Sequence, residues 1–244
     1  MNFQTNVLNF RIKQLFKEND MTVLQDNKID SSSDKGVQDR LLDAAEELFC
    51  EHGFADTSVR KIAAAANCNI ASVNYYFGGK DKLYLEVWRR HLRVMRNTRL
   101  ASIESVMSQK GGQPILEDLL TSYANAFVEP LVDKERGSRF IRLMAREMVD
   151  RHLPQNVFLE EMIIPVMNAL QQALMKICRG LDEAKASLVI LFLVGQLVHI
   201  SIAETMFEQS DKPKLPRFEM KEVIEHIVKF TAAGIRAYTE GKTE

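Results

Sequence analysis

The chain has 244 residues, of which 46% are hydrophobic and 27% are charged, and its formal net charge is −1. This composition is typical of a globular protein with a sizeable core, and it excludes a collagen-like or largely disordered chain. The near-zero net charge neither favours nor excludes nucleic acid as a partner. A small excess of Lys and Arg nevertheless falls between residues 35 and 100, and a small excess of Asp and Glu follows it.

Cysteine usage and hydropathy indicate the compartment. Cys50, Cys68 and Cys178 are far apart, show no metal-ligand spacing and fit free thiols in a reducing cytosol. The N-terminus lacks an apolar segment followed by a small-residue cleavage site, so we expect no secretory signal. The most apolar run, residues 188–203, contains polar side chains and is short for a membrane span. We therefore expect a buried helix there, a cytoplasmic protein and no membrane partner.

Residues 1–36 have the pattern of an extension rather than of a core segment. Apolar residues between Leu8 and Phe16 predict one or two amphipathic turns. The polar stretch from Ser31 to Gly36 predicts a flexible linker. Translation from Met21 is an alternative to translation from Met1.

Residues 57–80, TSVRKIAAAANCNIASVNYYFGGK, predict two short helices joined by a tight turn. Thr57 is suited to cap the first helix, and the Asn67–Asn69 segment interrupts it because Asn tolerates turn geometry. The second helix is predicted over residues 70–76 and ends at Gly78. This is a helix-turn-helix pattern, in which the second helix enters the major groove of DNA.

A longer helix is predicted just before this pattern, over residues 37–52. Its apolar residues recur at helical spacing, which gives it one face for packing, and Gly53 is placed to end it. We expect this face to pack across the helix-turn-helix, which would complete a DNA-binding unit of three helices.

The succession LLDAAEELFCEHGFADTSVRKIAAAANCNIASVNYYFGGKDKLYLEV, within residues 38–88, resembles the N-terminal domain of the TetR family of bacterial transcription regulators. The resemblance implies an all-α protein with a DNA-binding domain at residues 37–82 and a helical effector-binding and dimerisation domain at 83–244. It also implies a repressor released from a palindromic operator by a small ligand. Two positions depart from the family pattern. Asn67 or Cys68 replaces a usual Gly, and Asn74 replaces a usual Tyr, so the DNA preference of this chain is its own.

The predicted DNA contacts come from both helices. Asn74 can bond bidentately to adenine, and hydroxyl groups of the second helix can reach phosphates or base edges. The start of the first helix favours phosphate because its amide hydrogens are unpaired there. By resemblance, Lys80 clamps a phosphate and Tyr75 is more buried than Tyr76. The full predicted set is Thr57, Ser58, Arg60, Ala71, Ser72, Asn74, Tyr75, Tyr76 and Lys80.

The remainder of the chain predicts helices only. They are expected at residues 81–107, 115–129, 136–149, 154–178, 182–207 and 219–239. The helix at 81–107 carries five arginines, interpreted either as a solvated face or as weak attraction to DNA. The last two helices are broadly apolar, and by resemblance they form the homodimer interface, which would place two DNA-reading helices on a palindromic operator.

Polar groups in this apolar domain are candidate anchors for a small effector, which we expect to be apolar or amphipathic. The predicted effector site is Tyr123, Phe127, Phe140, Met144, Gln196 and His199, although aromatic, Met and His residues at helical spacing are also common in cores.

Two functions stay open: a ligand-responsive DNA-binding regulator, and a DNA-binding regulator or architectural protein without an effector. We expect no enzyme, because the sequence has no Gly-rich phosphate loop, nucleophile elbow or HExxH motif. We expect no metal and no cofactor, because the five histidines lack ligand spacing.

Overall fold

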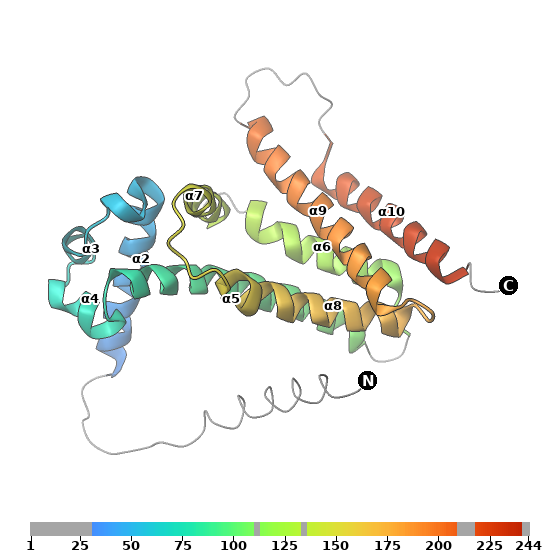
Figure 1. Cartoon of the computed structure of the whole chain (residues 1–244), viewed down its shortest axis with the longest axis horizontal. Coiled ribbons are helices and arrows are strands. Elements are labelled where there is room, and N and C mark those ends of the chain that lie inside the picture. Colours follow the sequence, from blue (N-terminus) through green and yellow to red (C-terminus); the bar gives the residue numbers. More distant parts are fainter. Residues whose placement is uncertain (1–30, 110–112, 133–135, 209–217, 241–244) are drawn as a thin grey trace, which may run out of the picture. The chain divides into compact units, whose positions relative to one another are not determined.

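A computed structural model of the chain describes residues 31–109, 113–132, 136–208 and 218–240. Every regular element in these ranges is helical, which confirms the predicted all-α class (Figure 1). The helices are α2 (Ser31–Asp56), α3 (Val59–Ala65), α4 (Ile70–Phe77), α5 (Lys80–Met107), α6 (Leu116–Val132), α7 (Arg136–Val149), the π-helical turn η1 (Leu159–Ile163), α8 (Ile164–Ile177), α9 (Glu183–Glu208) and α10 (Met220–Glu240).

Helix α2 differs from its prediction at one end. It begins at Ser31, so the stretch predicted as a flexible linker over 31–36 is helical. The remainder of the predicted extension, residues 1–30, lies outside the described residues. At the other end, Gly53 has φ 80° and ψ 176°, a backbone conformation that interrupts the helix as predicted and that glycine adopts without strain.

An N-terminal core forms where α2, α3, α4 and the first half of α5 meet. Phe49, Ile62, Val73 and Trp88, one from each helix, are almost completely buried in it. Phe140 of α7 joins the same core, so α7 packs against the three-helix unit although α5 and α6 lie between them in the sequence. The apolar spacing of α2 produces this arrangement because one stripe can be covered by two short helices.

A C-terminal core is built from the second half of α5 and from α6, α8, α9 and α10. Leu119, Leu170, Leu193 and Ile235 are buried in it, one each from α6, α8, α9 and α10. Helix α6 contacts both α5 and α10, while α8 contacts both α5 and α9 (Figure 1). Helix α5 therefore contributes to both cores and crosses the predicted domain boundary at residues 82–83.

The long helix predicted over 154–178 is divided in the structure. A π-helical turn precedes α8, and Pro165 is near the start of α8. Proline has no N–H to donate to the carbonyl four residues earlier, that of Glu161. Arg96 of α5 compensates, because its Nη1 donates to the Glu161 carbonyl at 3.1 Å.

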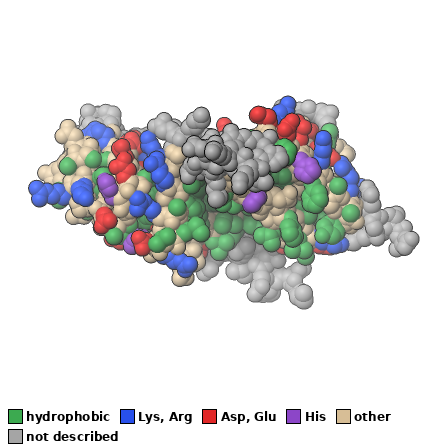
Figure 2. Space-filling view, turned by 90° about the horizontal axis from the view of Figure 1, so that it is seen from above, with side chains coloured by type: hydrophobic (Ala, Val, Ile, Leu, Met, Phe, Trp, Pro, Cys, Tyr) green, Lys and Arg blue, Asp and Glu red, His purple; other side chains and the backbone are tan. Residues whose placement is uncertain are grey.

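The described residues do not cover helix α9 on all sides. Apolar side chains of α9 and α10 remain exposed, and Figure 2 shows hydrophobic side chains gathered over the C-terminal helices. By length and composition, residues Glu183–Ala203 could also cross a membrane, with a mean hydropathy of 2.2, although core helices of soluble proteins pass the same test. The exposed members on these two helices include Leu188, Leu191, Phe192, Val198, Ile202, Phe230 and Tyr238.

Candidate nucleic-acid interface and effector region

The α3–turn–α4 unit has the helix caps that its sequence predicts, except that Ser58 rather than Thr57 caps α3. Ser58 caps α3, because its Oγ accepts from the Lys61 N–H at 3.2 Å. Asn67 has φ 50°, so this Asn adopts the left-handed geometry that a Gly would adopt freely. Asn69 caps α4 by accepting from the Ala71 N–H at 2.9 Å, and Gly78 ends it with φ 71°.

Thr57, predicted as the cap of α3 and as a DNA contact, does not cap α3 in the structure. Its side chain is completely buried, with 0% exposure. Its Oγ1 lies 2.7 Å from the Gly53 carbonyl and 3.1 Å from the Leu48 carbonyl, and the hydroxyl donates in this direction. The Thr57 N–H bonds to the Phe54 carbonyl at 3.3 Å rather than to Gly53, and the single hydroxyl hydrogen of Thr57 is directed at the Gly53 and Leu48 carbonyls. The predicted cap was therefore wrong, and the predicted DNA contact stays a prediction: the Thr57 side chain holds α3 to the end of α2.

Helix α4 turns one face to solvent. Ala71 and Asn74 are exposed, and Tyr75 is 79% exposed, while Val73 is fully buried. Ser72 is half-buried. The outward face therefore contains the residue types that sequence reasoning selected for DNA contact.

The two tyrosines of α4 have the reverse of the predicted burial. Tyr75 is the exposed one and Tyr76 is half-buried, and their rings meet edge to face with centroids 4.8 Å apart. The rotation of α4 follows from Val73, which must face the N-terminal core; a residue two positions later then lies on the opposite side. Ile70 is also exposed, but the predicted set of DNA contacts did not include it. Its position in the first turn of α4 is the one sequence feature that could have indicated this exposure.

Lys80, predicted to clamp a phosphate, is engaged inside the chain. Its ammonium donates to the carbonyls of Phe54 at 2.9 Å and Thr57 at 3.1 Å, and it lies 4.0 Å from the centroid of the Phe54 ring. An ammonium has three N–H donors, so at most one is left for a phosphate. Lys80 thus connects the start of α5 to the α2–α3 junction. Arg60, by contrast, is exposed beside the Ser58 cap.

The arginines predicted as a basic face of α5 point to different partners. Arg89 pairs with Glu86 and with Glu161 of η1, both at 2.8 Å. Arg90 pairs with Asp43 at 2.6 Å and with Glu46, both on α2. These side chains connect helices, so they do not form a free basic surface.

Glu46 lies at the centre of one such group of charges. His91 Nε2 lies 3.4 Å from its carboxylate, and Arg90 and Arg139 approach it from α5 and α7. Burial alone would raise the pKa of Glu46, but His91 and Arg90 outweigh it and lower the pKa to about 2. The carboxylate is therefore ionised and connects α2, α5 and α7.

Helix α7 is held against α2 and α5 by a second set of bonds. Glu147, a buried carboxylate, accepts from the Tyr84 hydroxyl at 2.8 Å and from the N–H groups of His152 and Leu153 at 2.9 and 2.7 Å. Arg146 Nε donates to the Cys50 carbonyl at 3.0 Å, next to the kink in α2. Burial first, and then Glu147, raise the pKa of Tyr84. Sequence reasoning missed this connection because its partners are far apart in the chain.

The six predicted effector residues do not surround one cavity. Tyr123 and Phe127 are neighbours on α6, with ring centroids 6.2 Å apart, and both are buried in the C-terminal core. Phe140 and Met144 belong to the N-terminal core instead. On α9, His199 is exposed. The predicted residues therefore lie in different parts of the structure, and their role in binding an effector stays a prediction. Helical spacing alone does not distinguish core from cavity.

Gln196, the sixth predicted effector residue, is half-buried on α9. Its amide donates to the Phe192 carbonyl of the same helix at 3.2 Å. That bond uses one of its two N–H groups locally.

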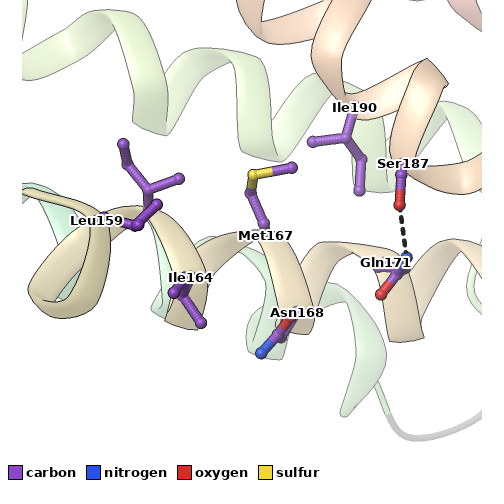
Figure 3. A pocket seen from close by; sticks show the side chains of 8 residues that line it. Leu159, Ile164, Met167, Asn168, Gln171, Ser187 and Ile190 are labelled. Atoms are coloured by element: carbon purple, nitrogen blue, oxygen red, sulfur yellow. Dashed lines mark hydrogen bonds between the residues drawn. The ribbon is translucent and has the colours of Figure 1, made fainter. Parts of the chain in front are cut away.

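A cavity of about 150 Å³ lies between η1, α8 and α9 (Figure 3). Its polar side is partly closed, because Gln171 Nε2 donates to Ser187 Oγ at 2.8 Å. None of the predicted effector residues lines it. In the described ranges, no group of three His, Cys, Asp or Glu side chains is arranged to hold a metal. The lining residues are Leu159, Ile163, Ile164, Met167, Asn168, Gln171, Ser187 and Ile190.

Two domain families match the chain. Residues 41–87 match the bacterial regulatory proteins of the tetR family, and residues 123–234 match the tetracyclin repressor-like C-terminal domain. The chain belongs to the TetR family. It is thus a TetR-family transcriptional regulator with a helix-turn-helix DNA-binding domain.

Individual relatives agree with this assignment. The chain is 24% identical to the probable HTH-type transcriptional regulator YttP of Bacillus subtilis, over 77% of this chain and 90% of that protein. It is 30% identical to the HTH-type transcriptional regulator BetI of Brucella anthropi, over 44% of this chain and 61% of that one. A crystal structure of a putative TetR-family regulator from Mesorhizobium loti aligns with a TM-score of 0.60 at 18% identity, covering 84% and 96% of the two chains, which supports the fold.

TetR-family regulators bind DNA operators, typically respond to small molecules and act as dimers. This TetR-family chain has two surfaces of note among its described residues, the exposed face of α4 and the exposed apolar side chains of α9 and α10. Helix α7 lies between these two surfaces in the sequence. It contacts α2 through Arg146 and α5 through Glu147.

Proposed function

We propose that this protein is a cytoplasmic repressor that binds a palindromic operator as a homodimer and leaves it when a small apolar or amphipathic molecule binds. The observation that carries the proposal is the outward face of α4, where Asn74 and Tyr75 are exposed on a helix anchored by Val73. In this proposal residues 37–82 form the DNA-binding domain and residues 83–244 form the effector-binding and dimerisation domain.

Base and phosphate contacts are assigned to different parts of the helix-turn-helix. Asn74 reads a base edge, because its amide can bond bidentately to adenine. Arg60 and the Ser58 hydroxyl contact phosphates from the start of α3, which positions α4 without reading sequence. The remaining contacts, to backbone or base edges, come from Ala71, Ser72, Tyr75 and Tyr76 on α4. Thr57 and Lys80 support the unit from inside.

The dimer would form through α9 and α10. Their exposed apolar side chains form a broad surface on two adjacent helices, and two such pairs from two copies make a four-helix interface. Burying Phe192, which is 69% exposed, and its neighbours would supply the apolar area that a stable dimer needs. A two-fold axis through this interface would also relate the two copies of α4.

Release from DNA requires an effector that prefers the DNA-incompetent arrangement of the helices. Helix α7 is suited to transmit that preference, because Glu147 contacts Tyr84 of α5 and Arg146 contacts the end of α2. A change at the C-terminal helices that moves α5 or α7 would therefore shift α2 and the helix-turn-helix with it.

A second candidate is a DNA-binding regulator without an effector. The observation in its favour is the size of the cavity, about 150 Å³, which is below the range of about 300 to 1,000 Å³ that is usual for small-molecule sites. Selecting DNA with the purified protein in the presence of candidate ligands separates the two candidates, because only the first predicts release.

The test of the DNA-binding assignment compares Asn74→Ala with Arg60→Ala on DNA selected from a random pool by the wild-type protein. Asn74→Ala should relax the preference at one base pair by about 1 to 3 kcal/mol. Arg60→Ala should weaken binding to all sequences and reduce the slope of log affinity against log salt by about 1. Asn168→Ala, the same change on α8, is the control that should alter neither. Equal loss on every sequence from Asn74→Ala would refute base readout at α4.

A further inference from the structure

One arginine of α5, Arg99, differs from the other arginines of this helix because it is buried. Arg99 is only 5% exposed, and no carboxylate in the described ranges lies within ion-pair distance of it. Its Nε–H is buried and has no hydrogen-bond partner in the part of the chain that the structure describes. A guanidinium stays charged near neutral pH, so burying it without a counter-charge is costly.

The contacts that Arg99 does make are weak substitutes for an anion. Its guanidinium carbon lies 3.9 Å from the centroid of the Phe127 ring, a cation–π contact, and its Nη1 lies 3.6 Å from the Met162 sulfur, a poor acceptor. Burial lowers the pKa of Arg99, and the nearby Tyr123 opposes this shift only in part. The surroundings thus lack what a buried guanidinium prefers, which is a bidentate oxyanion.

Arg99 also lies where the two cores meet. Phe127 belongs to the C-terminal core, whereas Met162 packs against the N-terminal core. Met162 is part of η1, and two other residues of that turn, Leu159 and Ile163, line the cavity between η1, α8 and α9. One π-helical turn therefore connects the unpaired charge with an apolar cavity, and π-helical turns are frequent at functional sites.

We propose that Arg99 is the anchor of an effector site that takes an oxyanion, a carboxylate or a phosphate, carried on a short apolar tail. The anion pairs with the guanidinium in place of the Met162 sulfur, and the tail packs along η1. A cavity of about 150 Å³ is large enough for a group the size of benzene, which limits the enclosed part of the tail to about six carbons.

This site would act on the helices that the proposed switch uses, and the inference rests on that proposed function. The turn η1 is attached to α5 at two further points, because Arg89 pairs with Glu161 and Arg96 donates to the Glu161 carbonyl. An anion that displaces Met162 alters η1, and η1 is fastened to the helix that begins in the DNA-binding unit. The charge of the ligand is thereby connected to the position of α5.

The experiment measures the Tm of the full-length protein with four eight-carbon probes: octanoate, octyl phosphate, octanol and octylamine. An oxyanion probe should raise the Tm of the wild type, and octanol and octylamine should not. Octanoate and octyl phosphate distinguish a carboxylate from a phosphate ligand. Equal shifts with octanol, or no shift with either anion, would overturn the inference.

Two substitutions of Arg99 locate the effect. Arg99→Met removes an unpaired buried charge and conserves volume, so the ligand-free variant should melt no lower than the wild type, and the anion-induced shift should disappear. Arg99→Lys should keep a smaller shift, because an ammonium is charged but not bidentate. Arg93→Met, at an exposed position of the same helix, is the control and should retain the shift. A marked fall in the Tm of Arg99→Met would assign Arg99 a structural role instead and refute the site.

DNA binding of the ligand-free wild type separates this inference from the proposed function. If the wild type selects no DNA sequence, the proposed function fails whatever the anions do. If it selects DNA and no anion raises its Tm, the inference about Arg99 fails and the DNA-binding regulator stands.

Discussion

The N-terminal and C-terminal cores differ in the partners of their buried charged side chains. In the first, Glu46 and Glu147 are buried with partners from other helices, so α2, α5 and α7 are tied together by directional bonds. Where the second core meets the first, Arg99 is buried without a charged partner among the described residues, and these residues also leave apolar faces of α9 and α10 uncovered. The first region is complete within one chain. The second has a buried charge without a charged partner and an exposed apolar surface in the part of the chain that the structure describes.

The largest effect on stability is expected from removing the hydrogen bonds that hold α7 in place. Glu147→Ala removes the acceptor of three hydrogen bonds, leaves the Tyr84 hydroxyl and two N–H groups unsatisfied, and should lower the free energy of unfolding by about 3 kcal/mol. Urea unfolding followed by circular dichroism measures it. Glu160→Ala, at an exposed position of η1, should change stability by less than about 0.5 kcal/mol. A similar loss of stability from both variants would contradict a stabilising role for the hydrogen bonds of Glu147.

The charge group around Glu46 should make the same core sensitive to acid. The pKa of Glu46 is lowered from 4.5 to about 2, so its contribution is present above about pH 4.5 and is lost as the pH falls toward 2. We expect a loss of about 2 to 3 kcal/mol over this interval. The measurement is the unfolding free energy of wild type and Glu46→Gln from pH 7 to pH 2. The gap between them should narrow below pH 4.5, and a constant gap would contradict the lowered pKa.

The exposed apolar face of α9 provides a test of the C-terminal region. Phe192→Asp should weaken the dimer by about 2 kcal/mol or more, a factor of at least about 30 in Kd, while the monomer stays folded because the side chain is already exposed. Sedimentation equilibrium measures the association. Val149→Asp places the same acid on an exposed apolar position of α7 and should leave the dimer intact. A monomeric wild type would remove the basis of the proposed interface.

Much of this fold could be predicted from the sequence, because local chemistry decides where helices begin and end. Residues 136–149 were predicted as a helix, and α7 has these bounds. The predicted end of α4 was confirmed because Gly78 adopts the left-handed conformation that only a few residue types accept. Apolar spacing and turn residues contain this information within a few positions of where it acts.

The candidate sites were less predictable, because they depend on which side of a helix meets another element. Five arginines recur along α5, and nothing in their spacing distinguishes Arg99, which is buried, from Arg93, which is exposed. The burial of Tyr75 and Tyr76 was reversed for the same reason, since α4 is short and its rotation is set by Val73. Glu147 and Tyr84 are 63 positions apart, and no local pattern pairs them.

The smallest expected effects come from the two hydroxyl residues whose roles were exchanged. Thr57→Val keeps the shape of a buried side chain but leaves the Gly53 and Leu48 carbonyls without its donor, and should lower stability by about 1 to 2 kcal/mol. Ser58→Ala removes only the exposed cap of α3 and should cost about 0.5 to 1 kcal/mol. Thermal unfolding of both variants measures these losses. DNA affinity corrected for the folded fraction should fall only for Ser58→Ala, because its hydroxyl is exposed at the start of α3. If Thr57→Val lost affinity while remaining folded, the hydroxyl of Thr57 would have to turn outward on DNA, and the N-terminal core would be less fixed than its bonds imply.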